Sequence, residues 1–357
     1  MKGLNFSKIQ NRLVFWVLSI SLITLVASML ITYTQQLKII NEKTFNKLVS
    51  IRNLKADQLN KWIDERIGDV TVIAGDYDIR IIEKNFNKSK KAELDPEINK
   101  NVKALLQRYI SIYNDYTNFY IINATTGLVE ISTLPEVVGG NRANNEYFTK
   151  PLETGSIYIK QVYYSIETNE PEMTFSIPIY SLEDPKQIFG ILVAHIDLEN
   201  SLYKLLQNRT GLGETGESLV VNKDKIAINE LRWYGNAPFN LKISAQPAVN
   251  AADGKTGIIK ALDYRDVKVL AAYTYIPRLG WGLVVKQDLK ELNAPVMRSA
   301  LDFILIIFIA SLIIVLFTVK FSRSFSVPII KMNEIAQKMG HGDFSSRNTI
   351  YSKDELG

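Results

Sequence analysis

The sequence predicts an α+β protein in which two modules with antiparallel sheets follow a long stalk helix, flanked by two membrane-spanning helices. Three observations support this prediction. Two uncharged apolar runs lie near the ends of the chain, helix-type periodicity follows each run, and the segment between them changes to short strand-like stretches separated by turn residues. A chain of 357 residues is long enough for more than one domain.

The composition excludes several classes of function. The absence of cysteine excludes disulfides, thiolate metal sites and a cysteine nucleophile. The two histidines, His195 and His341, leave little scope for imidazole metal ligation. The net charge of +5 comes without a basic stripe, so nucleic-acid binding has no support. We find no catalytic constellation, and we expect neither a metal nor a cofactor.

Residues 13–33 form the first predicted membrane span. They carry no formal charge, and a helix of this length crosses the hydrocarbon core of about 30 Å. The alternative is a cleaved signal peptide, whose apolar region usually has only about 7–15 residues. The longer run favours an uncleaved anchor.

Residues 303–319 form the second predicted span, which Lys320 closes. The run is at the short end of the usual range of about 17–25 residues, but Leu301 and a snorkelling Lys320 can extend it. A buried core helix is the alternative. Because the segment is apolar all round and has no wet face, lipid is the better solvent for it.

Basic residues flank both spans on the sides of the chain ends: Lys2, Lys8 and Arg12 before the first, and Lys320, Arg323 and Lys331 after the second. By the positive-inside rule, residues 1–12 and 320–357 are cytoplasmic and residues 34–302 are extracytoplasmic. The sequence therefore predicts a two-pass protein of the cell membrane.

Helical periodicity marks the start of the outer segment. Apolar residues recur at three- and four-residue steps within residues 36–75, which predicts a stalk helix with one apolar stripe: Leu59, Trp62, Ile63, Ile67, Val70 and Ile73. A further helix is predicted from Asp95 to about Tyr113, because Asp95 suits the N-cap and Pro96 suits the first turn.

Beyond Tyr113 the pattern changes to strands. The first set of candidate strands is 118–122, 128–132, 156–164, 172–180 and 188–196, and a fainter set follows at 217–222, 225–229, 266–275 and 282–287. The closing strands of the two sets are alike, beginning at Gly190 and Gly282. We interpret this as an internal repeat of two modules, a membrane-distal one at about 76–203 and a membrane-proximal one at about 204–295.

Short motifs in this segment resemble the double Cache sensor domains of bacterial and archaeal receptors, which have a long N-terminal helix and two PAS-like modules. The motifs are EYF at 146–148, TG at 154–155, EPEMT at 170–174, SIPI at 176–179, GILV at 190–193 and GWG at 280–282. Each is common by itself, and their order over residues 36–295 carries the resemblance. The resemblance implies that a small molecule binds in the membrane-distal module.

The resemblance also places the pocket between the loop that follows residue 142 and the next strands. The candidate ligand-binding residues are Arg142, Asn145, Tyr147, Phe148, Tyr163, Ser165, His195 and Asp197. Aromatic walls can enclose an amine through cation–π contact, and an arginine can pair with a carboxylate. The alternative is that part of these aromatic residues fill the core and that Arg142 is a solvated loop residue.

Amino-acid receptors of this family typically show Arg-x-Trp-Tyr here and an aspartate on the closing strand. The corresponding positions are Asn145, Tyr147, Phe148 and His195, so both charged anchors of an α-amino acid are missing from them. Arg142 and Asp197 are possible substitutes; another carboxylate or an uncharged metabolite is the alternative ligand. If His195 faces the pocket, binding should depend on pH between about 5.5 and 7.5. A structural histidine is the alternative.

After Lys320 the apolar residues follow a heptad pattern: Phe325, Ile329, Met332, Ala336 and Met339. This spacing predicts a parallel seam between identical chains, and hence a homodimer through this segment and the stalk helices. Pro328, the connector GHGDF at 340–344 and the ending DELG at 354–357 resemble a HAMP domain. A HAMP domain has a second helix after the last motif, so we expect residues 320–357 to be a truncated HAMP domain and an output domain to follow in a longer protein.

Together these features predict a transmembrane receptor that relays the binding of a small extracellular molecule through the second span and the HAMP domain. A histidine kinase is the expected output, and a diguanylate cyclase or a methyl-accepting chemotaxis domain is the alternative. A membrane-anchored extracytoplasmic enzyme is an alternative of another class, which the missing catalytic constellation disfavours. A structural or adhesion protein would not need the HAMP-like end.

Overall fold

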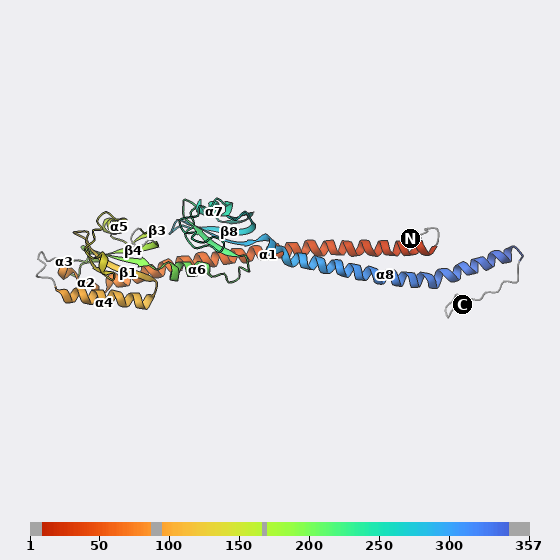
Figure 1. Cartoon of the computed structure of the whole chain (residues 1–357), viewed down its shortest axis with the longest axis horizontal. Coiled ribbons are helices and arrows are strands. Elements are labelled where there is room, and N and C mark those ends of the chain that lie inside the picture. Colours follow the sequence, from red (N-terminus) through yellow and green to blue (C-terminus); the bar gives the residue numbers. More distant parts are fainter. Residues whose placement is uncertain (1–8, 87–94, 166–169, 343–357) are drawn as a thin grey trace. The chain divides into compact units, whose positions relative to one another are not determined.

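The computed structural model describes residues 9–86, 95–165 and 170–342 (Figure 1). The chain divides into two units. One contains residues 1–43 and 292–357, and the other contains residues 44–291. The first unit is helical where it is described, and the second contains both sheets.

The helical unit contains parts of two long helices, α1 (Ile9–Gly75) and α8 (Leu289–Gly340). These parts are α1 up to Lys43 and α8 from Leu292 onward. Both helices contain segments long and apolar enough to cross a membrane. Large apolar side chains in these segments are exposed in the protein alone, among them Ile23 (67% exposed) and Phe317 (69%). Exposure of apolar surface to water costs about 25 cal/mol per Å². A lipid environment therefore accounts for both segments.

Helix α8 continues without interruption past Lys320 to Gly340 and includes Pro328. The predicted heptad positions from Ile329 to Met339 therefore lie on one helix. The Phe325 side chain and residues 343–357, with the rest of the connector and the DELG motif, lie outside the described residues.

The sensor unit begins with the part of α1 that follows Lys43, and most of its predicted apolar stripe is buried: Leu59, Trp62, Ile63, Val70 and Ile73. The short helices α2 (Tyr77–Arg80) and α3 (Glu83–Phe86) follow, and then α4 (Pro96–Tyr113). Helix α4 starts as predicted, because the Asp95 carboxylate accepts a hydrogen bond of 3.0 Å from the Glu97 N–H.

The first sheet has five antiparallel strands in the order β2-β1-β5-β4-β3. The strands are β1 (Tyr116–Asn123), β2 (Val129–Ser132), β3 (Tyr158–Tyr164), β4 (Pro171–Tyr180) and β5 (Ile188–Ile196). Helices α1 and α4 pack against one face, and α5 (Glu146–Thr154) lies on the other (Figure 1). A 3₁₀ turn, η2 (Pro135–Val137), follows β2.

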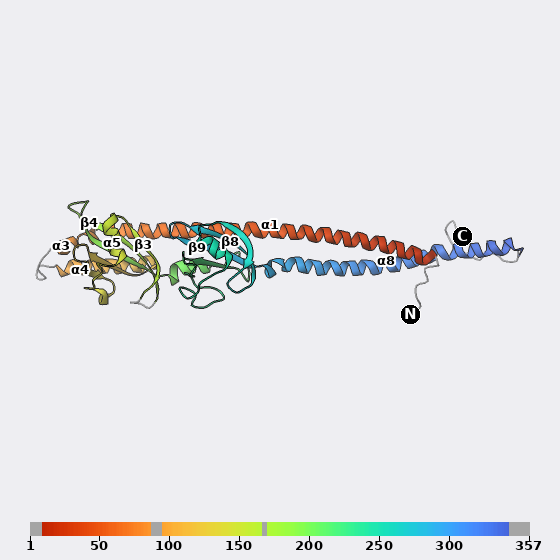
Figure 2. The same ribbon diagram turned by 90° about the horizontal axis from the view of Figure 1, so that it is seen from above.

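The π-helical turn η3 (Glu199–Tyr203) and α6 (Lys204–Gln207) lead to the second sheet, which has the order β6-β9-β8-β7. Its strands are β6 (Glu217–Val221), β7 (Gly257–Leu262), β8 (Lys268–Ile276) and β9 (Trp281–Asp288). Helix α7 (Gln246–Ala252) packs on one face. The two sheets follow one another along the part of α1 that belongs to this unit (Figure 2).

The two sheets share one strand order, β1-β5-β4-β3 in the first and β6-β9-β8-β7 in the second, which agrees with the predicted repeat. One predicted strand was wrong. Residues 225–229 form only isolated bridges, because Ala227 exchanges its backbone hydrogen bonds with Leu241 and Phe239 of a loop, and the Asn229 side chain accepts from the Val220 N–H. Strand β7 and helices α5 and α7 were not predicted.

Candidate ligand-binding site

The face of the first sheet on the side of α5 carries polar side chains at alternate strand positions. Strand β4 turns Met173 and Phe175 into the core beside α1, so Glu172 and Thr174 point to the opposite face. The strand register pairs His195 of β5 with Thr174 on one side and Asn118 of β1 on the other. Residues directly opposite in antiparallel strands share a face, so these polar side chains meet.

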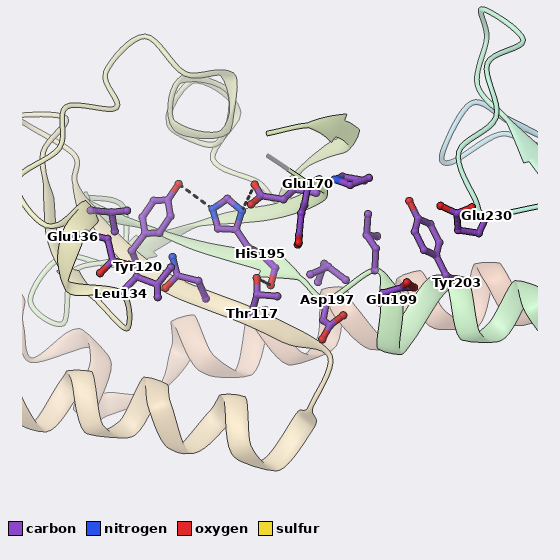
Figure 3. A pocket seen from close by; sticks show the side chains of 16 residues that line it. Thr117, Tyr120, Leu134, Glu136, Glu170, His195, Asp197, Glu199, Tyr203 and Glu230 are labelled. Carbon is purple, nitrogen blue, oxygen red and sulfur yellow. Dashed lines mark hydrogen bonds and ion pairs between the residues drawn. The ribbon is translucent and has the colours of Figure 1, made fainter. Parts of the chain in front are cut away.

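His195 lies at the centre of this face and bridges two neighbours (Figure 3). Its Nε2 atom lies 3.2 Å from the Tyr120 hydroxyl, and its Nδ1 atom lies 3.2 Å from a carboxylate oxygen of Glu172. The Thr174 hydroxyl lies 3.3 Å from the same Nδ1. Because a carboxylate only accepts hydrogen bonds, a neutral His195 donates from Nδ1 to Glu172 and accepts the Tyr120 O–H at Nε2.

Tyr163 completes this network from β3. Its hydroxyl donates to the same Glu172 oxygen over 3.0 Å and lies 3.1 Å from the Thr174 hydroxyl. Burial, reinforced by the Glu172 charge, raises the pKa of Tyr163 above its ordinary value, and the Thr174 hydrogen bond only partly opposes this. Burial also raises the pKa of Tyr120. Both phenols therefore stay protonated at neutral pH and act as hydrogen-bond donors.

An aromatic wall stands behind the network. The Tyr147 ring lies edge-on to Tyr120 and His195, with ring centroids 6.3 and 6.5 Å apart. The Asn145 amide donates to the Tyr147 hydroxyl. Phe148 is buried in the apolar cluster on this face of the sheet. Asn145, Tyr147 and Phe148 thus fix the start of α5 over the sheet.

Lys160 of the chain itself occupies the aromatic cage that the sequence suggested for an amine. Its Nζ atom lies 3.5 Å from the Tyr163 ring centroid and 5.6 Å from the Tyr147 centroid. Separations below about 6 Å are typical of cation–π contacts. These two rings therefore already bind a cation of the protein.

A cavity of about 570 Å³ opens beside His195 and extends along the sheet toward Tyr203 and Glu230 (Figure 3). Small-molecule sites usually measure about 300–1,000 Å³. Within the described part of the chain its lining includes no lysine or arginine, whereas carboxylates contribute at six positions: Glu136, Glu170, Glu172, Asp197, Glu199 and Glu230. Like charges gathered around a cavity give it a negative potential, which attracts cations and repels anions.

The predicted site residues fall into three groups. His195 and Asp197 line the cavity. The second group contacts the His195 network or its partners but does not belong to the described lining; it consists of Asn145, Tyr147 and Tyr163. Phe148 packs in the apolar cluster on the same face.

The remaining candidates have backbone or capping contacts. Arg142 is half-buried and its backbone N–H donates to the Gly127 carbonyl over 2.7 Å. Ser165 is buried, and its N–H donates to the Glu170 carbonyl over 2.9 Å. Neither belongs to the described cavity lining. Asp197 accepts from the Asn200 N–H and side-chain amide, at 3.0 and 2.8 Å, so it also caps the turn after β5.

Several residues of this sheet face and of the cavity lining were not predicted from the sequence. The signal for Glu172 and Thr174 was present, because a strand with polar residues at every second position and buried apolar residues between them marks a polar face. Tyr203 and Glu230 lie on η3 and in the loop after β6, where no periodicity applies.

The second sheet fills the equivalent place with its own side chains. Lys286 of β9 lies on the face covered by α7 and is 1% exposed. Its Nζ atom lies 2.9 Å from Glu217 and also pairs with Asp263. The Tyr264 hydroxyl donates to Glu217 over 2.9 Å. The cavity left here is about 10 Å³, which is about the volume that a single water needs.

Two curated chemotaxis receptors of Bacillus subtilis resemble the chain. Methyl-accepting chemotaxis protein McpA is 21% identical over 304 residues, which cover 84% of this chain and 42% of McpA. Methyl-accepting chemotaxis protein McpB is 21% identical over 262 residues, which cover 72% of this chain and 37% of McpB. The chain therefore spans less than half the length of these relatives.

Among solved structures, the ligand-binding domain of the Campylobacter jejuni chemoreceptor Tlp3, in complex with 4-methylisoleucine, has a similar fold. The TM-score is 0.54 at 16% identity, and the match covers 71% of this chain and 94% of that domain. Residues 33–296 match the Cache domain and residues 320–357 match the HAMP domain. Since the Cache match covers more than half of the chain, the protein belongs to the Cache domain family and is a transmembrane-type sensor with a HAMP domain.

Proposed function

We propose that the chain binds a small organic molecule in the cavity beside His195 and relays that event along α8 to its HAMP domain. One observation carries the proposal. The two sheets have the same strand order but differ at the equivalent position on one face. The first sheet has a cavity of about 570 Å³ there, and in the second sheet the Lys286 network fills this position. Because only the first of the two modules keeps a large cavity at this position, we assign ligand binding to the first module. In this proposal the first module is the membrane-distal one.

The His195 network suits recognition because its groups are held before a ligand arrives. Tyr120, Glu172 and Thr174 fix the ring from both sides of β5, so little side-chain entropy is lost on binding. A ligand shifts the receptor between two arrangements only by its difference in affinity for them. We place that shift in a homodimer that pairs through the HAMP segment and the stalk part of α1.

The membrane arrangement is a two-pass one with both chain ends in the cytoplasm, which the flanking basic residues support. The cysteine-free sequence allows a direct test with single cysteines at two exposed positions, Asn144→Cys in the sensor unit and Met339→Cys near the end of α8. In intact cells a membrane-impermeant maleimide should label only Asn144→Cys. Labelling of Met339→Cys alone would reverse the orientation.

The output is a chemotaxis signalling domain in this proposal. Both curated relatives are methyl-accepting chemotaxis proteins, which favours this output over the histidine kinase expected from the sequence. The histidine kinase and the diguanylate cyclase stay alternative predictions for the output domain.

A fusion of residues 1–357 to the signalling part of McpA tests the whole scheme in Bacillus subtilis cells that lack their own chemoreceptors. Compounds that raise the melting temperature of the purified chain should change the swimming bias of these cells. The same fusion with His195→Phe should lose the response at equal expression. A response that survives His195→Phe, or stabilising compounds that never change the bias, would contradict the scheme.

A further inference from the structure

We propose that the end of the cavity at Tyr203 is a subsite for the ammonium group of an organic amine that carries no carboxylate; this inference rests on the proposed function above. Tyr203 ends η3, lines the cavity and is only 4% exposed (Figure 3). Its hydroxyl has no hydrogen-bond partner among the described residues. Leaving a buried polar group unsatisfied is unfavourable, so this hydroxyl calls for a partner from a ligand.

Two carboxylates stand at the same end of the cavity. Glu199 belongs to η3, and Glu230 belongs to the loop after β6. The described residues provide neither of them with an ion pair. Burial, together with the charges of Glu230 and Glu199, raises the pKa of Tyr203, so the phenol stays neutral. An ammonium group has three donors and no acceptor, and it matches one phenol oxygen and two carboxylates.

The rest of the cavity selects against a carboxylate on the ligand. No described lining residue is a lysine or arginine, so an anionic group would find no permanent positive charge in the lining and would be repelled by its carboxylates. Leu134, Val137 and Leu198 offer apolar wall for an aliphatic chain. The expected ligand is therefore a mono- or diamine, in contrast to the 4-methylisoleucine bound by Tlp3.

The subsite also draws on both modules. Glu199 and Tyr203 follow the last strand of the first sheet, whereas Glu230 follows the first strand of the second. An ammonium group at this place would contact both modules at once. Amine binding should then stabilise the sensor unit as a whole.

Isothermal titration of the full chain in lipid nanodiscs tests the inference with four probes: n-butylamine, 1,4-diaminobutane, butyrate and norvaline. The two amines should bind, and butyrate, which keeps the carbon chain of n-butylamine but reverses the charge, should not. Norvaline should bind at least about tenfold more weakly than n-butylamine, because its carboxylate adds like-charge repulsion. Binding of butyrate or norvaline as tight as that of the amines would overturn the inference.

Substitutions then locate the subsite. Tyr203→Phe removes only the hydroxyl, and Glu230→Gln removes only a charge at a half-buried loop position that should tolerate it. Each should weaken n-butylamine about tenfold or more, since a hydrogen bond to a charged group is lost. The matched control Glu183→Gln removes an exposed carboxylate from the turn between β4 and β5 and should leave the affinity unchanged. Amine affinity unchanged in both Tyr203→Phe and Glu230→Gln overturns the inference.

Failure of this inference and failure of the proposed function differ in the His195→Phe variant. If a carboxylate or neutral compound from a wider panel binds and needs His195 while neither amine does, the sensor function stands and the amine subsite falls. If the compounds that bind do so equally well with and without His195, the proposed site itself falls, and the amine subsite falls with it.

Discussion

His195 has contacts on both sides of its ring, and losing them should have a measurable cost. His195→Phe keeps an aromatic ring at this place but leaves the Tyr120 hydroxyl and Glu172 without a nitrogen partner. Unsatisfied buried polar groups cost about 1–3 kcal/mol, so the free energy of unfolding should fall by about that amount. Urea denaturation followed by tryptophan fluorescence measures it. His341→Phe, at the other histidine and on an exposed position, should change nothing.

Lys286 is the clearest case of a buried charge that its partners hold in place. Lys286→Met removes the cation between Glu217 and Asp263 and leaves the buried Glu217 without an ion pair, whereas Asp263 keeps its pair with Arg265. Breaking a buried ion pair from one side costs about 3–5 kcal/mol. Thermal unfolding should show a clear loss of stability, with Lys268→Met on an exposed position of β8 as the unchanged control. Equal melting temperatures of the two variants would mean that the network contributes nothing.

Asp263 makes the stability of the second module depend on pH. Burial raises its pKa, but hydrogen bonds from Lys286 and Arg265 outweigh burial and bring the pKa below its ordinary value. A carboxyl whose pKa is lower in the folded state than in the unfolded chain, where it is about 3.9, stabilises the fold above that pH. This stability is lost as the pH falls through the folded-state pKa. The urea midpoint should therefore fall steeply below about pH 4, and the fall should be shallower in Asp263→Asn.

At the scale of single residues, the sequence predicted the site residue His195 but not its counterpart in the second sheet, Lys286. His195 was predicted because the family resemblance aligns it with the aspartate that amino-acid receptors carry on the closing strand. When the closing strands are aligned on Gly190 and Gly282, Gln287 corresponds to His195. In the structure the residue that corresponds to His195 is Lys286, because Lys286 lies with Val284 on the face covered by α7. A shift of one residue moves a side chain to the other face of a strand, and sequence similarity alone does not set the register.

At the scale of elements, the start of α8 is tied to the loop before β6. The Glu291 carboxylate accepts from the Glu214 and Thr215 N–H groups, at 2.9 and 2.8 Å, and from the Thr215 hydroxyl. Gly213 allows this approach: it has a φ of +69°, and an added Cβ would lie 2.2 Å from the Glu291 carboxylate. This contact links the second sheet to the helix that continues toward the HAMP domain.

Gly213→Ala should therefore uncouple binding from output. The new methyl group displaces Glu291, so the McpA fusion should lose its ligand response while the affinity measured by titration stays within about twofold. Gly254→Ala is the matched control, since it has a φ of +83° and open space around it. Both variants carry about 1–2 kcal/mol of left-handed backbone strain, and only Gly213→Ala should lose signalling. Loss of signalling in both variants would mean that backbone strain, and not the displacement of Glu291, causes the effect.

Elements with strong periodicity were predictable, and elements held by tertiary contacts were not. The stalk stripe and the Asp95 cap of α4 follow from local rules, and the structure confirms both. Helix α5 escaped prediction because Pro151 interrupts its nine residues and its apolar side chains serve the sheet below. Strand β7 is partly exposed and lacks a strict alternation. Packing against β8 stabilises it more than its own sequence does.

At the scale of the molecule, the central feature is one fold used twice for different ends. The Lys286 network fills the second module, and the first module keeps its cavity and its negative lining. The internal repeat of two modules was predicted from the sequence, but which of the two keeps a cavity was not. That choice depends on side chains from loops and turns, such as Glu136 and Tyr203, whose positions only the tertiary fold determines.

The most direct test of the central claim is a thermal-shift comparison of the full chain with Thr117→Trp, which places a large side chain in the cavity wall from an exposed position. A small molecule at about 100 times its Kd adds about 2.7 kcal/mol to the stability of the folded state. For a unit of this size that corresponds to a rise of about 5 °C or more in the melting temperature. We predict such a rise in the wild-type chain and none in Thr117→Trp. An equal rise in both proteins would show that the ligand binds elsewhere.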